Sequence, residues 1–278
     1  MVTVNSVSGG KTSAYIAKEY PADYNVFCLV RTSDMDCQYP DKKLRQIVSD
    51  KIGKEFIGTI EEDTIIKTLL DLEQFIGTEI TWLSGETFDD VIDNEGRILP
   101  SRYRRFCTTE LKLKPIIHWW QENIKEIVEM RIGFRAGEER RANKVIAKCI
   151  DGIESNKMVV GKRKTRNKWA DIAWRKPIFP LINDRINKID IENYWLQYPE
   201  VQHQRMNNCA GCFHRNPILL RKQFDWHPNK MEWFIKQEQK GKGTFKEGMT
   251  YQQIKEHKLQ AELDFDDFND CDSGYCGV

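Results

Sequence analysis

The stretch "VNSVSGGKTSAYIA" (residues 4–17) decides the fold, because it joins a strand pattern to a helix pattern through Gly9 and Gly10. Apolar β-branched residues interrupted by polar ones predict a strand, and the run from Thr12 onward predicts a helix. Two glycines let backbone N–H groups approach an anion, and the N-terminus of the following helix adds partial positive charge. The stretch therefore predicts either an anion-binding loop or an ordinary turn between a strand and a helix.

The loop is not the phosphate loop of nucleoside triphosphatases. The run Gly10-Lys11-Thr12 matches the end of the pattern G-x-x-x-x-G-K-[ST], but that pattern requires a glycine at position 5, where this chain has Asn5. The residues support a shorter and tighter loop. Its hydroxyl donors are Ser8, Thr12 and Ser13.

Composition bounds the class of protein. The chain has 278 residues, with 43 Lys and Arg against 42 Asp and Glu, so its net charge of +1 gives no global attraction for nucleic acid. No run approaches the roughly 18 apolar residues that a membrane span needs, so we expect a soluble, cytoplasmic protein without a membrane partner. Eight cysteines in a chain of this length do not indicate a secreted disulfide framework.

Short apolar runs alternate with amphipathic stretches through the first half of the chain. Strands are expected at residues 3–7, 25–30, 55–60 and 128–134, and helices at 12–19, 40–52, 64–75 and 109–123. This alternation predicts an α/β fold with a doubly wound, mostly parallel sheet, in which ligands bind at the carboxyl ends of the strands.

The character of the sequence changes near residue 185. A helix pattern at 187–200, a cysteine-bearing loop, a Trp-rich segment and an acidic tail follow. We therefore expect a nucleotide-type α/β domain over residues 1–185 and a C-terminal, cysteine-bearing appendage over 186–278. The basic stretch 155–170 is expected to be a solvated loop, with a contact surface for phosphate or nucleic acid as the alternative.

Cys107 lies in a strongly basic context, "RYRRFCTTELKLKPI" (102–116). Neighbouring arginines and a following helix that carries Lys112 predict a depressed thiol pKa, which favours metal binding or nucleophilic attack. The alternative is a buried cysteine behind a basic surface helix.

Arg135 follows the strand expected at 128–134, within "GFRAGEERRA" (133–142). This position places it at a carboxyl end of the sheet, where an arginine fork clamps phosphate or sulfate oxygens. Arg140 and Arg141 are equally compatible with surface pairing to Glu138 and Glu139.

Cys209 and Cys212 form a Cys-x-x-Cys pair in the loop "NNCAGCFHR" (207–215). A late position in an Asn- and Gly-containing loop favours half of a metal site over a redox pair, and two structural thiols are the remaining alternative. Cys107 is the leading third ligand. Candidates for a fourth ligand are Cys271, Cys276 and His214.

Taken in order, "SGGKTS" (8–13), "RFCTTELKLKPI" (105–116), "GFRAGEERR" (133–141) and "CAGCF" (209–213) resemble the phosphoadenosine-phosphosulfate (PAPS) reductase family. That family belongs to the PP-loop ATP-pyrophosphatase superfamily, whose loop is S-G-G-x-[DT]-S. The resemblance implies an adenine nucleotide alpha-hydrolase-like, Rossmann-like fold, with adenine near Leu29 to Thr32. It also implies a phosphate or sulfate site formed by Ser8, Gly9, Gly10, Lys11, Thr12, Ser13 and Arg135.

The chain departs from the reductases in two places. Their tail is Glu-Cys-Gly-x-His, whereas this chain has Tyr275 before Cys276 and no histidine after it. Cluster-bearing reductases have two adjacent cysteines where this chain has Phe106 and Cys107. Relatives that activate a substrate with ATP or transfer sulfur match better, and some of them hold an iron–sulfur cluster. The corresponding ligands here are Cys107, Cys209 and Cys212.

Three functions follow as expectations. The first is an enzyme that cleaves ATP, with Mg²⁺, between the α- and β-phosphates and passes AMP to an acceptor such as a tRNA base, DNA or a small molecule. Its catalytic candidates are Arg135 and Lys112, beside an iron–sulfur cluster or zinc. The second is a reductase of phosphoadenosine phosphosulfate, with Cys276 as nucleophile and a thioredoxin-like reductant. The third is a binding module without catalysis. A homo-oligomer is expected in each case.

Overall fold

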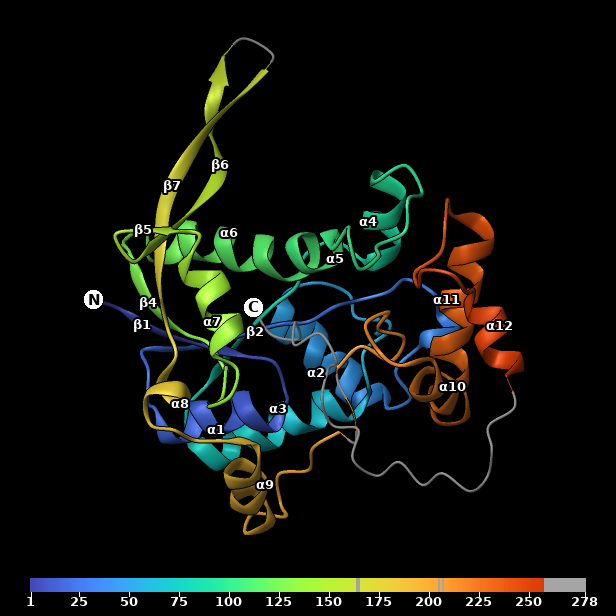
Figure 1. The fold of residues 1–278 in the computed structure, drawn as a ribbon, viewed down its shortest axis with the longest axis horizontal. Coiled ribbons are helices and arrows are strands. Elements are labelled where there is room, and N and C mark those ends of the chain that lie inside the picture. Colours follow the sequence, from blue (N-terminus) through green and yellow to red (C-terminus); the bar gives the residue numbers. More distant parts are fainter. Residues whose placement is uncertain (164–165, 205, 207, 258–278) are drawn as a thin grey trace.

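A seven-stranded sheet forms the centre of the structure, a computed structural model in which residues 1–163, 166–204, 206 and 208–257 are described. The strand order is β3-β2-β1-β4-β7-β6-β5 (Figure 1). Strands β3, β2, β1, β4 and β7 run parallel, and β6 and β5 are antiparallel to their neighbours. The strands are β1 (Thr3–Val7), β2 (Tyr24–Cys28), β3 (Ile80–Leu83), β4 (Val128–Arg131), β5 (Cys149–Ile150), β6 (Ile153–Arg163) and β7 (Arg166–Ile178). The expected α/β class with a mostly parallel sheet is confirmed.

Helices lie on both faces of the sheet (Figure 1). Those of the first half are α1 (Lys11–Glu19), α2 (Lys42–Ile52), α3 (Thr64–Ile76), α4 (Phe88–Asn94), α5 (Phe106–Thr108), α6 (Lys114–Asn123) and α7 (Glu139–Ile146), with a 3₁₀ turn η1 (Met35–Cys37) and a π-helical turn η2 (Thr109–Leu113) between them. The later ones are α8 (Pro180–Asn183), α9 (Lys188–Leu196), α10 (Pro217–Trp226), α11 (Pro228–Lys240) and α12 (Tyr251–Glu256).

Alternation along the strands divides the core between the two faces of the sheet. Val7 and Phe27 belong to the cluster formed with α1, α3 and α9. Val4 and Val26 belong to the cluster formed with α6 and α7. Because successive side chains of a strand point to opposite faces, both sides of the central strands are buried, as a doubly wound sheet requires.

The C-terminal helices share a third core with the first half of the chain. Trp233 and Phe234 of α11 pack in one cluster with Val30, which follows β2, and Phe88 of α4. On the other side of the molecule, Trp195 of α9 belongs to the cluster under α1 and α3. Residues on both sides of position 185 therefore contribute to the same clusters.

Two local expectations were wrong, and one strand was missed. Residues 55–60 are not a strand of the sheet, since only Gly58 makes isolated bridges there, to Thr32 and Gln38. The edge strand β3 was not expected. The basic stretch 155–170 is not a loop but most of a β-hairpin formed by β6 and β7, which extends away from the rest of the molecule (Figure 1).

No helix within the described residues is both long and apolar enough to cross a membrane.

Candidate functional site

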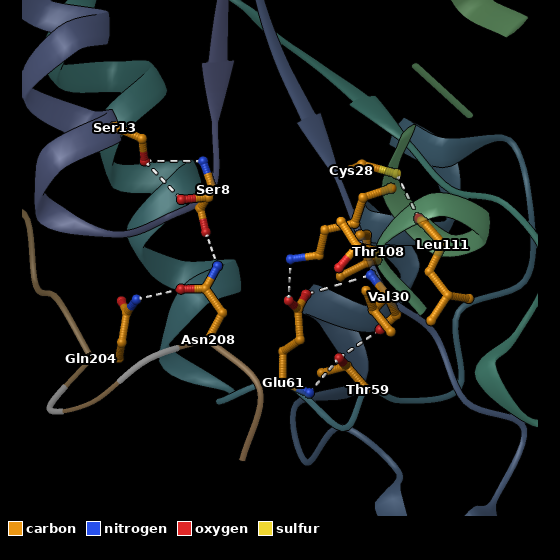
Figure 2. A network of polar contacts seen from close by, with 12 residues as sticks. Ser8, Ser13, Cys28, Val30, Thr59, Glu61, Thr108, Leu111, Gln204 and Asn208 are labelled. Atoms are coloured by element: carbon orange, nitrogen blue, oxygen red, sulfur yellow. Dashed lines mark hydrogen bonds and ion pairs between the residues drawn. The ribbon is translucent and has the colours of Figure 1, made fainter. Parts of the chain in front are cut away.

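The loop after β1 has a backbone that only glycine tolerates. Gly9 has φ +78°, and a Cβ at this position would lie 2.7 Å from Cγ2 of Ile65 in α3. Ser13 holds the turn from the other side: its hydroxyl accepts from the Ser8 N–H at 3.0 Å and donates to the Gly10 carbonyl at 3.0 Å. The Ser8 and Ser13 hydroxyls are 3.1 Å apart, as Figure 2 shows.

The N-terminus of α1 has no side-chain cap. Gly10 is the N-cap residue, and it makes no side-chain hydrogen bond to the first turn of this helix. The first N–H groups of a helix have no partner within the helix, so they and the helix dipole favour a negative ligand.

The loop also lies where the sheet changes direction. From β1 the chain passes to β2 on one side, whereas β4 pairs with β1 on the other side. In open parallel sheets this switch point is where ligands bind, beyond the carboxyl ends of the strands.

The segment after β4 lies directly against the loop. A Cβ on Gly133 would approach Cγ2 of Thr12 to 3.3 Å, so the absence of a side chain lets the two segments meet. Arg135 follows two residues later, and its N–H and Nε donate to Glu138 at 2.8 and 3.1 Å. The expected proximity of the 8–13 and 133–142 motifs is therefore present.

Glu138 joins two arginines. Its second carboxylate oxygen accepts from Arg141, whose guanidinium lies 4.2 Å from the ring centre of Phe134. Burial would raise the pKa of Glu138, but hydrogen bonds from Arg135 and the charges of both arginines lower it, so the carboxylate stays ionised. Nε and Nη2 of Arg141 are buried and have no hydrogen-bond partner among the described residues. Arg141 is thus a stronger anion-binding candidate than its sequence position indicated.

The cysteine-bearing loop contacts the loop that follows β1. The Asn208 side chain donates to the carbonyl of Ser8 and accepts from Gln204 at 2.9 Å (Figure 2). The carbonyl of Asn208 accepts from the Glu62 N–H at 2.7 Å. Nearby, burial lowers the pKa of His203 to about 4, against the opposing influence of the Gly9 backbone.

Lys112, a catalytic candidate, forms an ion pair with a buried carboxylate. Its Nζ lies 2.9 Å from Oε1 of Glu61, a residue that is only 2% exposed. The other carboxylate oxygen of Glu61 accepts from the Val30 N–H at 3.4 Å, beyond the end of β2 (Figure 2). The Cys28 thiol, at the end of β2, donates to the carbonyl of Leu111 at 3.1 Å and so fixes the segment that carries Lys112.

Thr32, expected near adenine, is in the interior. Its hydroxyl donates to Asp89 at 2.5 Å and its N–H donates to Gly58 at 3.0 Å. With 2% exposure, its side chain supports the segment beyond β2 from inside.

The pKa of the Cys107 thiol shifts in the direction opposite to the prediction. Burial raises its pKa, and the charge of Arg105 and the hydrogen bond with Thr108 only partly oppose this. The expectation of a depressed pKa was wrong, because desolvation of the thiolate outweighs the neighbouring cations.

The thiols within the described residues do not form a ligand set for a metal or a cluster. Cys107 and Cys209 pack against the same apolar core. Burial raises the pKa of Tyr251, and the nearby Cys212 and Cys209 add to this. Even so, the described ranges contain no group of three or more His, Cys, Asp or Glu side chains that could hold a metal ion. Cys271 and Cys276 lie outside the described residues.

The sequence did not indicate four residues that lie at the candidate site: Glu61, His203, Gln204 and Asn208. Only Asn208 lay next to a sequence motif, the Cys-x-x-Cys pair; the others lie in segments without a motif.

Comparison with family models, with curated proteins and with solved structures yields no match for this chain.

Proposed function

We propose that the chain binds ATP, as its magnesium complex, with the phosphates on the loop of residues 8–13. In this proposal an acceptor attacks the α-phosphorus, the bond to the β-phosphate oxygen breaks, and pyrophosphate leaves. The observation that carries the proposal is the loop at the β1/β4 switch point, with its left-handed Gly9, the uncapped N-terminus of α1 and Gly133 against Thr12.

The arginines of the segment after β4 suit the charge that develops in this reaction. Arg135 and Arg141 are held by one ionised carboxylate, so their orientation is set before a ligand arrives. Preorganised donors of this kind stabilise a transition state because they need no rearrangement when the leaving pyrophosphate gains charge. Since the described thiols do not form a ligand set, no step is assigned to an iron–sulfur cluster or zinc.

Calorimetric titration with Mg–ATP and, separately, with phosphoadenosine phosphosulfate tests the proposal. We expect ATP to bind and Thr12→Val to raise its Kd about tenfold, the loss expected for one hydrogen bond to a charged oxygen. Ser155→Ala is the matched control, because Ser155 is exposed on β6, far along the chain from the loop.

Product analysis then identifies the bond that breaks. Release of pyrophosphate, with AMP joined to the acceptor or freed when water is the acceptor, supports the proposal, whereas ADP and phosphate would contradict it. Binding of the sulfonucleotide but not of ATP would replace the proposal with the reductase. Binding of ATP without turnover in the presence of candidate acceptors would favour the module without catalysis.

A further inference from the structure

Among the residues that the structure describes, no further strand pairs with the outer part of the β6–β7 hairpin. β4 pairs with β7 only from Arg175 to Ile178, and β5 pairs with β6 only at residues 153 and 154. Farther out, the two strands pair only with each other, from Met158 opposite Ala170 to Arg163 opposite Arg166 (Figure 1). Between residues 159 and 169, every side chain that the structure describes is exposed. We call residues 155–170 the basic ribbon.

The basic ribbon concentrates positive charge. Its 16 residues include six cations and no carboxylate: Lys157, Lys162, Arg163, Lys164, Arg166 and Lys168. Because the whole chain has a net charge of +1, the remaining residues together carry −5. The near-neutral total therefore hides a local field that attracts a polyanion.

An exposed aromatic ring accompanies this charge. Trp169 is 56% exposed and stands directly opposite Val159, which is 41% exposed. Residues directly opposite in an antiparallel pair point to the same face, and Lys157 lies two residues from Val159, on that face too. The ribbon thus presents an indole ring beside a cation on one surface.

Two simpler explanations account for only part of this. Lysines on a free strand edge prevent edge-to-edge aggregation, but that role does not require an exposed tryptophan. A second copy paired ribbon to ribbon would bring two strongly positive segments together, which like-charge repulsion disfavours. A nucleic acid satisfies both features, because its phosphates pair with the cations and its bases stack on aromatic rings.

We propose that the basic ribbon binds single-stranded nucleic acid that crosses the ribbon, with Trp169 stacked on an unpaired base, Lys157 on a phosphate at the face of Trp169 and Lys168 on a phosphate at the opposite face. A two-stranded ribbon also fits the major groove of a duplex, but there the bases are stacked on each other and offer no face to an indole. The inference does not depend on the proposed nucleotide site, since the ribbon lies outside the switch point.

Fluorescence anisotropy of a labelled single-stranded oligonucleotide, without any nucleotide added, measures this binding. Trp169→Ala is expected to weaken binding about 5- to 150-fold, the range for loss of one stacked base. The double variant Lys157→Gln/Lys168→Gln is expected to reduce the slope of log K against log salt by roughly 1.4, because each phosphate contact on a single strand contributes about 0.7.

Matched controls separate the ribbon from general charge. Lys42→Gln/Lys43→Gln removes the same two charges from exposed positions at the start of α2, and it should leave affinity and slope near those of the native chain. Trp169→Phe retains a stacking ring and should bind more tightly than Trp169→Ala. Both ribbon variants change exposed residues, so unchanged thermal unfolding would confirm that they fold.

Three results would overturn the proposal. They are no binding by the native chain at low salt, equal losses in the two lysine double variants, and tighter binding of a duplex than of its separate strand. A shift from dimer to monomer on Trp169→Ala, with nucleic-acid affinity unchanged, would assign the ribbon to self-association instead.

Discussion

At the scale of single residues, the ion pair between Lys112 and Glu61 indicates that Lys112 stabilises the fold. Glu61 is almost completely buried, whereas Lys112 is 26% exposed, so removing the lysine leaves a carboxylate without its counter-charge in a poorly solvated place. Lys112→Met is therefore expected to lower the free energy of unfolding by about 2–3 kcal/mol in urea titrations. Lys114→Met is the control, because the Lys114 and Glu110 side chains are 52% and 27% exposed. The carboxylate left behind there is much better solvated than that of Glu61, and exposed pairs contribute about 0–1 kcal/mol.

The double variant Lys112→Met/Glu61→Gln tests whether the unpaired Glu61 carboxylate causes the loss of stability. It removes both charges, so part of the lost stability should return. If Lys112→Met alone changed turnover but not stability, the pair would have a catalytic role and the structural interpretation would be wrong.

His203 gives a prediction about pH at the same scale. Burial lowers its pKa to about 4 in the folded chain, whereas an unfolded chain titrates near 6.5. As the pH falls from 6.5 toward 4, the unfolded state gains a proton that the folded state does not, so the free energy of unfolding decreases. His203→Gln removes this contribution, which is on the order of 1 kcal/mol between pH 6.5 and 5 once partial exposure is allowed for.

Unfolding titrations of both proteins at pH 7.5 and pH 5 check this expectation. The native chain should lose more stability than His203→Gln over that interval. Burial also lowers the pKa of His214 and of His227 to about 4, so the variant keeps a residual pH dependence. Identical losses in the two proteins would show that His203 does not contribute.

At the scale of elements, the Cys-x-x-Cys loop depends on its close fit to α11. A Cβ on Gly211 would lie 2.4 Å from the ring of Phe234, which is stacked on Tyr251 and cannot move aside. Gly211→Ala should therefore destabilise the chain by about 2 kcal/mol, as overpacking in a dense core does. Gly161→Ala is the control, since nothing lies within 4 Å of a Cβ there; thermal unfolding compares the two. Equal melting temperatures would mean that the loop can shift.

Some elements have a clear apolar periodicity in the sequence, and others have none. The helix that becomes α3 has Ile65, Leu69 and Leu72 on one buried side, and this periodicity made it visible. The β6–β7 hairpin lacked such a signal because both faces of its outer half are in water, so its strands show no alternation of apolar and polar residues. Residues 55–60 gave the opposite error: Phe56 and Ile60 are buried, but the backbone of this segment does not join the sheet.

At the scale of the whole molecule, the sequence predicted that the loop at 8–13 and the segment with Arg135 would lie together. It did not predict that the cysteine-bearing loop would contact them. The loop at 8–13 and Arg135 both follow strands, so a parallel sheet places them at one edge. The contact of Asn208 with Ser8 joins segments about 200 positions apart, and neither the charge nor the spacing of those residues indicates it. Tertiary packing of the C-terminal helices on the region after β2 sets that contact, and no local pattern encodes it.

The tip of the basic ribbon should be separable from the rest of the fold. Met158 is 5% exposed and its sulfur accepts from Gln121 of α6 at 3.0 Å, so the packed part of the hairpin extends to the Met158–Ala170 pair. Replacing residues 159–169 by Asn-Gly joins that pair through a turn suited to a two-residue hairpin. Because the replaced side chains that the structure describes are exposed, the melting temperature should change by less than about 3 °C.

The shortened chain should keep its affinity for Mg–ATP and lose its affinity for the single-stranded oligonucleotide. Calorimetry and anisotropy on the same preparation measure both properties. Loss of both affinities with an unchanged melting temperature would mean that the ribbon reaches the nucleotide site, and that the two surfaces bind one ligand. Retention of both would place the nucleic-acid contact elsewhere on the molecule, because five of the six cations of the ribbon and Trp169 are removed together.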